Sequence, residues 1–149
     1  MKNIYIHIGN FKTASTSIQT FIFLNKNLFN KNKIQVLLEK NFKTTTNNMV
    51  LFKYINNMNK TKIKNYFSKA SKTQDLLITC EYFSTFSNDP NKLIFFKNIM
   101  KEIGFKPIII FYYRCDNSYL YSFYSELLTH RKIIKVDNVF SFIKKIRKN

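Results

Sequence analysis

The chain has 149 residues, 45% of them hydrophobic and 17% aromatic, which is too apolar for a disordered protein and suits one domain with one core. Its longest apolar run, IIIFYY at 108–113, is far shorter than the about 20 residues of a membrane-spanning helix. The formal net charge of +17 would favour anionic partners, but the lysines are spread over every predicted helix. The excess of positive charge is explained either by compositional drift on solvated faces or by a selected attraction for anions. We expect no specific nucleic-acid partner.

The N-terminal residues lead directly into a predicted strand. They contain neither an apolar stretch of about 7–15 residues nor the cleavage site of a secretory signal, so a cytoplasmic, unprocessed chain is expected. The two cysteines, Cys80 and Cys115, are too few for a disulfide framework and lack the spacing of metal ligands. We therefore expect reduced thiols and no metal.

The first predicted elements are a strand and a helix joined by a short loop. The strand covers 4–8 and ends at Gly9. Apolar residues then recur at helical spacing, which predicts an amphipathic helix; they are Ile18, Phe21, Ile22, Leu28 and Phe29.

Two further helices and a second strand are expected in the middle of the chain. The apolar residues of 51–58 and of 63–70 recur at i, i+3, i+4 and i+7, the pattern of a helix with one buried face. A short apolar run at 76–79 predicts a strand that leads into Cys80 and Glu81.

The next helix is bounded by residues suited to its two ends. Asn88 or Asp89 can cap it, Pro90 suits its first turn, and Gly104 suits the position after its last turn. Its expected buried face consists of Leu93, Phe96, Met100 and Ile103.

The C-terminal third is expected to hold one strand and two helices. The apolar run at 108–113 predicts a buried strand, 118–128 a helix, and Asp137 can cap a last helix that carries Val139, Phe142, Ile143 and Ile146.

Strands that alternate with helices indicate parallel pairing, so we expect an α/β fold with three layers, α/β/α, around a mostly parallel sheet. Ligands bind beyond the carboxyl ends of the strands in such sheets. Gly9, Glu81 and Arg114 each follow a predicted strand. They should therefore converge on one edge of the sheet.

The loop KTASTS at 12–17 is the first candidate binding element. It would place an ammonium, four hydroxyls and several backbone N–H groups at the start of a helix, where an anion is favoured. The nucleotide-triphosphatase loop puts its lysine immediately before the magnesium-binding Ser/Thr, whereas Lys12 comes early here. An ordinary Ser/Thr-rich helix cap is the alternative explanation.

Arg114 and Ser122 form the second candidate element. Arg114, at a strand end, can offer several planar donors to a phosphate, and the hydroxyl of Ser122, eight residues later on a helix, could reach the same group.

These two segments together resemble the PAPS-dependent sulfotransferases, most closely the bacterial and carbohydrate-type branch. In that family a strand leads to a loop of the form K-T-G-T-T-S, and an Arg at a later strand end is followed by a Ser eight positions on. The chain has Lys12 through Ser17 followed by Ile18 and Gln19, and later Arg114 and Ser122. The resemblance spans about residues 3–128 and implies a P-loop NTPase-like sulfotransferase fold.

The resemblance also implies roles for these residues. The cofactor would be 3′-phosphoadenosine 5′-phosphosulfate (PAPS), with its 5′-phosphosulfate held by Lys12, Thr13, Ala14, Ser15, Thr16 and Ser17 and its 3′-phosphate by Arg114 and Ser122. The sulfuryl group would pass to a hydroxyl or amine of a glycan or similar acceptor, and no metal would be required. Lys12 would stabilise the charge that develops on the leaving phosphate oxygen.

An acceptor hydroxyl also needs a general base. Related carbohydrate sulfotransferases use a Glu, and LLITCEYFS at 76–84 resembles the segment that carries one, so Glu81 is the candidate; an exposed acid balancing nearby lysines is the alternative. His7 competes for this role but lies inside the first strand, where a structural histidine is expected. His130 adjoins Arg131 in a basic segment and is expected to be solvated.

The chain departs from the family pattern in two places. Ala14 replaces a glycine, which costs about 1 kcal/mol if that position needs a positive φ. The chain also ends about 27 residues after Ser122, so residues 1–149 are interpreted as a single sulfotransferase-like domain without the usual C-terminal part. A P-loop nucleotide kinase or NTPase and a non-enzymatic basic anion-binding module remain as alternatives.

Overall fold

The computed structural model describes residues 1–9, 15–39, 47–112, 118, 122 and 125. Within these residues the strands form one four-stranded, all-parallel sheet in the order β2-β3-β1-β4. The strands are β1 (Lys2–Gly9), β2 (Ile34–Val36), β3 (Asp75–Thr79) and β4 (Phe105–Tyr112). The expected α/β class with a parallel sheet is therefore confirmed.

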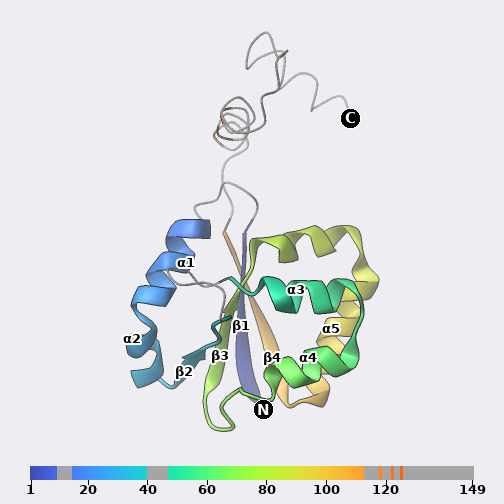
Figure 1. The fold of residues 1–149 in the computed structure, drawn as a ribbon, viewed down its shortest axis with the longest axis horizontal. Coiled ribbons are helices and arrows are strands. Elements are labelled where there is room, and N and C mark those ends of the chain that lie inside the picture. Colours follow the sequence, from blue (N-terminus) through green and yellow to red (C-terminus); the bar gives the residue numbers. More distant parts are fainter. Residues whose placement is uncertain (10–14, 40–46, 113–117, 119–121, 123–124, 126–149) are drawn as a thin grey trace.

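Helices lie on both faces of this sheet (Figure 1). One face carries α1 (Ser15–Leu24) and α2 (Lys26–Lys31), and the other carries α3 (Met49–Asn56), α4 (Lys60–Phe67) and α5 (Pro90–Glu102). A 3₁₀ segment, η1 (Glu81–Asn88), connects β3 to α5. This arrangement is compatible with three α/β/α layers.

The main core lies between the sheet and the layer of α3, α4 and α5. The strand side chains Ile4, Ile6, Leu76 and Ile78 pack there against helix residues that include Leu51, Ile55, Ile63, Phe67, Phe96 and Met100. The helical periodicity read from 51–58 and 63–70 thus marks two core-facing helices, as predicted.

The N-terminal helix differs from its prediction. The chain breaks at Asn25 into α1 and α2, and Phe21 and Leu28 are 57% and 55% exposed. The buried residues of α1 are Ser15, Gln19 and Ile22. The helix turns this partly polar row toward the sheet, so the expectation that the apolar stripe forms the buried face is wrong for Phe21 and Leu28.

Two other burial predictions are wrong. The strand expected at 108–113 is β4, which is an edge strand of the described sheet because it pairs only with β1. Its residues Ile109 and Phe111 are therefore half exposed. Leu93, in the first turn of α5, is 44% exposed, whereas Phe96 and Met100 of the same predicted face are buried.

The predicted ends of α5 are confirmed in position. Asp89 occupies the N-cap position, although its side chain caps no backbone N–H, and Pro90 begins the helix. Gly104 has a φ of 85°, a backbone conformation that residues with a Cβ rarely adopt.

The helix predicted over 118–128 is described only at Ser118, Ser122 and Ser125, which are helical. Four other predictions lie outside the described residues: those for the last helix, the Tyr113 end of the third predicted strand, Cys115 and His130.

Candidate functional site

The carboxyl ends of the described strands meet at one edge of the sheet. In the parallel register His7 of β1 lies opposite Thr79 of β3, and Gly9 lies opposite Tyr112 of β4. β1, β3 and β4 end at this edge with Gly9, Thr79 and Tyr112. The convergence expected for Gly9 and Glu81 is confirmed, whereas Arg114 lies outside the described residues.

The helices that follow β1 and β3 lie on opposite faces of the sheet. The next helix after β1 is α1 on one face, while β3 continues through η1 to α5 on the other face (Figure 1). Because β1 and β3 are neighbours, their ends form a topological switch point. Open parallel sheets bind their ligands in the crevice at such a point.

A hydrogen bond spans this switch point. The hydroxyl of Ser15, the first residue of α1, donates to Oε2 of Glu81, the first residue of η1, at 2.5 Å. That length is typical of a hydroxyl bound to a carboxylate. Ser15 is 4% exposed and Glu81 is partly exposed, so the carboxylate is held in a fixed position while it remains accessible.

The remaining candidate residues are only partly described. Thr16 and Ser17 are exposed in the first turn of α1, where their backbone N–H groups are among the unpaired donors of a helix start. Ser122 is helical and partly buried. Lys12, Thr13 and Ala14 lie, like Arg114, outside the described residues.

His7 is a buried histidine below this edge. Its side chain is 2% exposed, its Nδ1 lies 2.7 Å from Oγ1 of Thr79, and its ring contacts the ring of Tyr112 edge-on. Burial lowers the pKa of His7 below 6.5, which favours the neutral imidazole. The expectation of a hydrogen-bonded structural histidine is supported, since a base with so little exposure does not meet an acceptor in this conformation.

The lowered pKa of His7 predicts a pH dependence of stability. Between the folded pKa and 6.5 the unfolded chain binds more protons, so the free energy of unfolding should fall as the pH drops through this window, by up to about 1.4 kcal/mol per unit. His7→Asn can keep a hydrogen bond to Thr79 but does not titrate. Urea unfolding of both proteins from pH 7.5 to 5 should show the steeper loss in the wild type; equal slopes would contradict a buried neutral His7, because His130 is common to both.

Cys80 follows β3 but is not a candidate nucleophile. It is fully buried, its Sγ lies 3.7 Å from Sδ of Met49, and burial raises its thiol pKa to about 12. A thiol with this pKa is almost entirely protonated near neutral pH. Cys80 is free, as expected for a reduced thiol.

Two other kinds of functional feature are absent from the described part of the chain. No group of three His, Cys, Asp or Glu side chains there is arranged to hold a metal ion. None of the helices in the same ranges is both long and apolar enough to cross a bilayer.

Comparison of the chain with models of protein families found no match, and comparison with curated proteins found none.

One further acidic residue lies at the same edge and was missed by the sequence reasoning. Glu39 follows the short strand β2, and the hydrogen bond from the Leu37 N–H to the Leu77 carbonyl extends the pairing of β2 and β3 toward it. Both Glu39 oxygens accept from backbone N–H groups of α3. In the sequence, the position of Glu39 directly after a run of apolar residues could have indicated that it follows a strand.

Proposed function

We propose that the chain is a PAPS-dependent sulfotransferase domain with a P-loop NTPase-like sulfotransferase fold. The observation that carries the proposal is the placement of the α1 start and Glu81 together at the switch point between β1 and β3. This placement combines an anion-favouring helix start with a carboxylate able to accept a proton. Ser15 belongs to the first of the two motifs that resemble the sulfotransferases, and Glu81 lies between the two motifs in the sequence.

The donor's two anionic ends are assigned to the two motifs. Lys12 and the backbone amides through Ser17 bind the 5′-phosphosulfate, and Arg114 and Ser122 bind the 3′-phosphate. Thr16 and Ser17 support this assignment because their side chains are exposed at the start of α1.

The reaction is an in-line transfer in which the acceptor oxygen attacks sulfur. The bond between sulfur and the bridging phosphate oxygen breaks, and 3′-phosphoadenosine 5′-phosphate (PAP) leaves with the negative charge. The Lys12 ammonium and the loop amides stabilise that charge as it develops. Glu81 takes the proton of the acceptor hydroxyl, and Ser15 positions the Glu81 carboxylate through its hydrogen bond.

The acceptor proposed is a glycan or a similar molecule with free hydroxyl or amine groups. This assignment rests on the resemblance alone. The net charge of +17 would attract the strongly anionic donor at low ionic strength and raise its rate of association.

A P-loop nucleotide kinase or NTPase is the second candidate, and the contact between Ser15 and Glu81 favours it. In such enzymes a loop Ser/Thr and an acidic residue after a neighbouring strand hold Mg²⁺. The early position of Lys12 argues against this reading, because the triphosphatase lysine directly precedes the metal-binding hydroxyl. A basic module that binds anions without catalysis would need neither the contact between Ser15 and Glu81 nor the particular position of Lys12.

A comparison of ligands by thermal unfolding tests the proposal. PAP at a hundred times its dissociation constant should stabilise the chain by about 2.7 kcal/mol, raising its melting temperature by several degrees, and should do so in EDTA. A shift with ATP that depends on Mg²⁺, without a shift with PAP, would favour the kinase or NTPase. Equal, salt-sensitive shifts with any polyanion would favour the binding module.

A further inference from the structure

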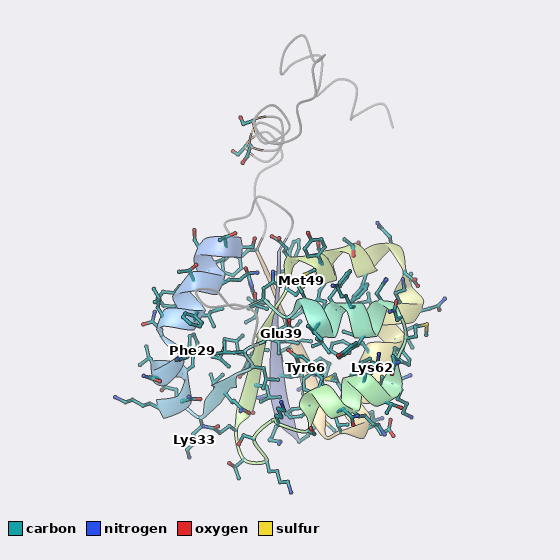
Figure 2. The ribbon with its side chains drawn as sticks, viewed as in Figure 1. Phe29, Lys33, Glu39, Met49, Lys62 and Tyr66 are labelled. Carbon is teal, nitrogen blue, oxygen red and sulfur yellow. The ribbon has the colours of Figure 1, made fainter. Side chains whose placement is uncertain are left out.

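A cavity of about 570 Å³ lies on the opposite face of the sheet from α1, among the end of β2, α3 and α4. Its size falls within the range of small-molecule sites. Leu37, Leu38, Val50 and Tyr54 supply apolar lining, while Glu39, Lys62, Tyr66 and Lys69 supply polar lining. Glu39, Lys62 and Tyr66 are labelled in Figure 2.

The polar groups at the base of the cavity are already paired. Glu39 is 8% exposed and accepts from the N–H groups of Val50 and Leu51. Tyr66 donates its hydroxyl to Oε1 of Glu39 at 3.2 Å and accepts from Nδ2 of the fully buried Asn48 at 2.6 Å. Burial and the neighbouring Glu39 raise the pKa of Tyr66, so its hydroxyl stays protonated. The side chains of Glu39 and Tyr66 are therefore held in place by hydrogen bonds at the bottom of the cavity.

The lysines in and just after α4 divide into two sets that differ in their partners. Lys60 and Lys64 both form ion pairs with Glu102, at 3.1 and 2.6 Å. Lys62 and Lys69 line the cavity instead, and neither forms an ion pair with a described carboxylate. Lys60 and Lys64 are therefore paired with a carboxylate, whereas Lys62 and Lys69 have no ion-pair partner among the described carboxylates.

Lys62 and Lys69 share the cavity with apolar lining residues. Nζ of Lys62 lies 5.7 Å from the centre of the Tyr54 ring, and the partly exposed Val50 belongs to the same lining. Such a combination suits a ligand with an acidic group and a ring or short hydrocarbon body, because the acid can pair with lysine while the body covers apolar surface.

We propose that this cavity binds a small amphipathic anion, in which a carboxylate, sulfate ester or phosphate ester contacts Lys62 and Lys69 and an apolar body packs on Val50 and Tyr54. The residues that line this cavity include none of those assigned to the proposed PAPS site. Glu39 does not repel such a ligand strongly, since backbone N–H groups and the Tyr66 hydroxyl already bind its oxygens.

A fluorescence titration of the full chain with 1-anilinonaphthalene-8-sulfonate tests this site. We expect saturable binding that weakens at least tenfold in Lys62→Ala/Lys69→Ala. The matched control is Lys60→Ala/Lys64→Ala, which removes the same charge from the same region of the chain and should change affinity less than twofold. Circular dichroism confirms that both variants are folded.

Competition experiments distinguish binding that requires both an acidic group and an apolar body from nonspecific hydrophobic binding. 2-Naphthalenesulfonate should displace the probe, whereas neutral 2-naphthol and inorganic phosphate at the same concentration should displace it at least tenfold less effectively. Leu38→Glu, which adds a like charge to the lining, should also weaken binding and provides a second variant. Absence of binding to the wild type, equal losses in the two double variants, or equal displacement by 2-naphthol would overturn the proposal.

Discussion

Glu81→Gln is expected to lower the rate of sulfuryl transfer from PAPS by about 10²–10⁴-fold, the range that a general base contributes. The amide can still accept the hydrogen bond from Ser15 but cannot take the proton of an acceptor hydroxyl. The measurement is the rate of PAP release at saturating PAPS in the presence of a panel of glycans. Affinity for PAP should stay within about threefold of the wild type, since a base contributes to proton transfer rather than donor binding.

Ser15→Ala is the matched control for this substitution. It removes the hydroxyl that positions Glu81 but leaves the carboxylate, so its rate should lie between those of the wild type and Glu81→Gln. If Glu81→Gln left the rate unchanged, or lost PAP affinity and rate in equal proportion, the assignment of Glu81 as general base would be wrong. If Glu81→Gln instead abolished a Mg²⁺-dependent affinity for ATP, the carboxylate would be a metal ligand.

Lys12→Ala is expected to lower the same rate by about 10²–10³-fold, because it removes a charged donor from the oxygen that becomes negative in the transition state. The loss should be larger in the rate at saturation than in the affinity for PAPS, as for an interaction that strengthens along the reaction. The effect is measured as PAP release over a range of PAPS concentrations.

Lys31→Ala serves as the control for Lys12→Ala. Lys31 ends α2 and is exposed, so its removal lowers the net charge equally without touching the proposed loop. Equal losses in the two variants would show that Lys12 acts only through the overall charge, and would support a binding module over an enzyme.

Much of the fold could be predicted from residue periodicity. The strands around 4–8 and 76–79 and the helices at α3 and α4 were correctly expected, because each buries one apolar row or face in the same core. The short strand β2 was missed: it spans only three residues, all partly exposed, and so carries little pattern. The segment after β3 forms the 3₁₀ turns of η1, which have no signal as clear as that of an α-helix.

Burial at the margins of the fold could not be read from the sequence. Phe21 and Ile109 look like core residues by type, yet both are more than half exposed. Whether such a residue is buried depends on how its helix is rotated against the sheet, or on whether its strand has a second neighbour. Neither property is encoded in local periodicity.

The candidate site was predicted in part by the topology of parallel sheets. That rule placed Gly9 and Glu81 at one edge, and the structure agrees. The hydrogen bond between Ser15 and Glu81 joins residues 66 positions apart and depends on the rotation of α1, so no sequence pattern indicated it. The same holds for the cavity beside Lys62, because its lining residues come from separate parts of the chain: the segment after β2, α3, and α4 with Lys69 just beyond it.

Isothermal titration of the chain with PAP in EDTA tests the proposed donor site most directly. The proposal predicts saturable binding of one PAP per chain without metal, and at least tenfold weaker binding in Arg114→Ala, which removes a charge-assisted contact to the 3′-phosphate. Binding of ATP only in the presence of Mg²⁺, with no heat from PAP at millimolar concentration, would contradict it.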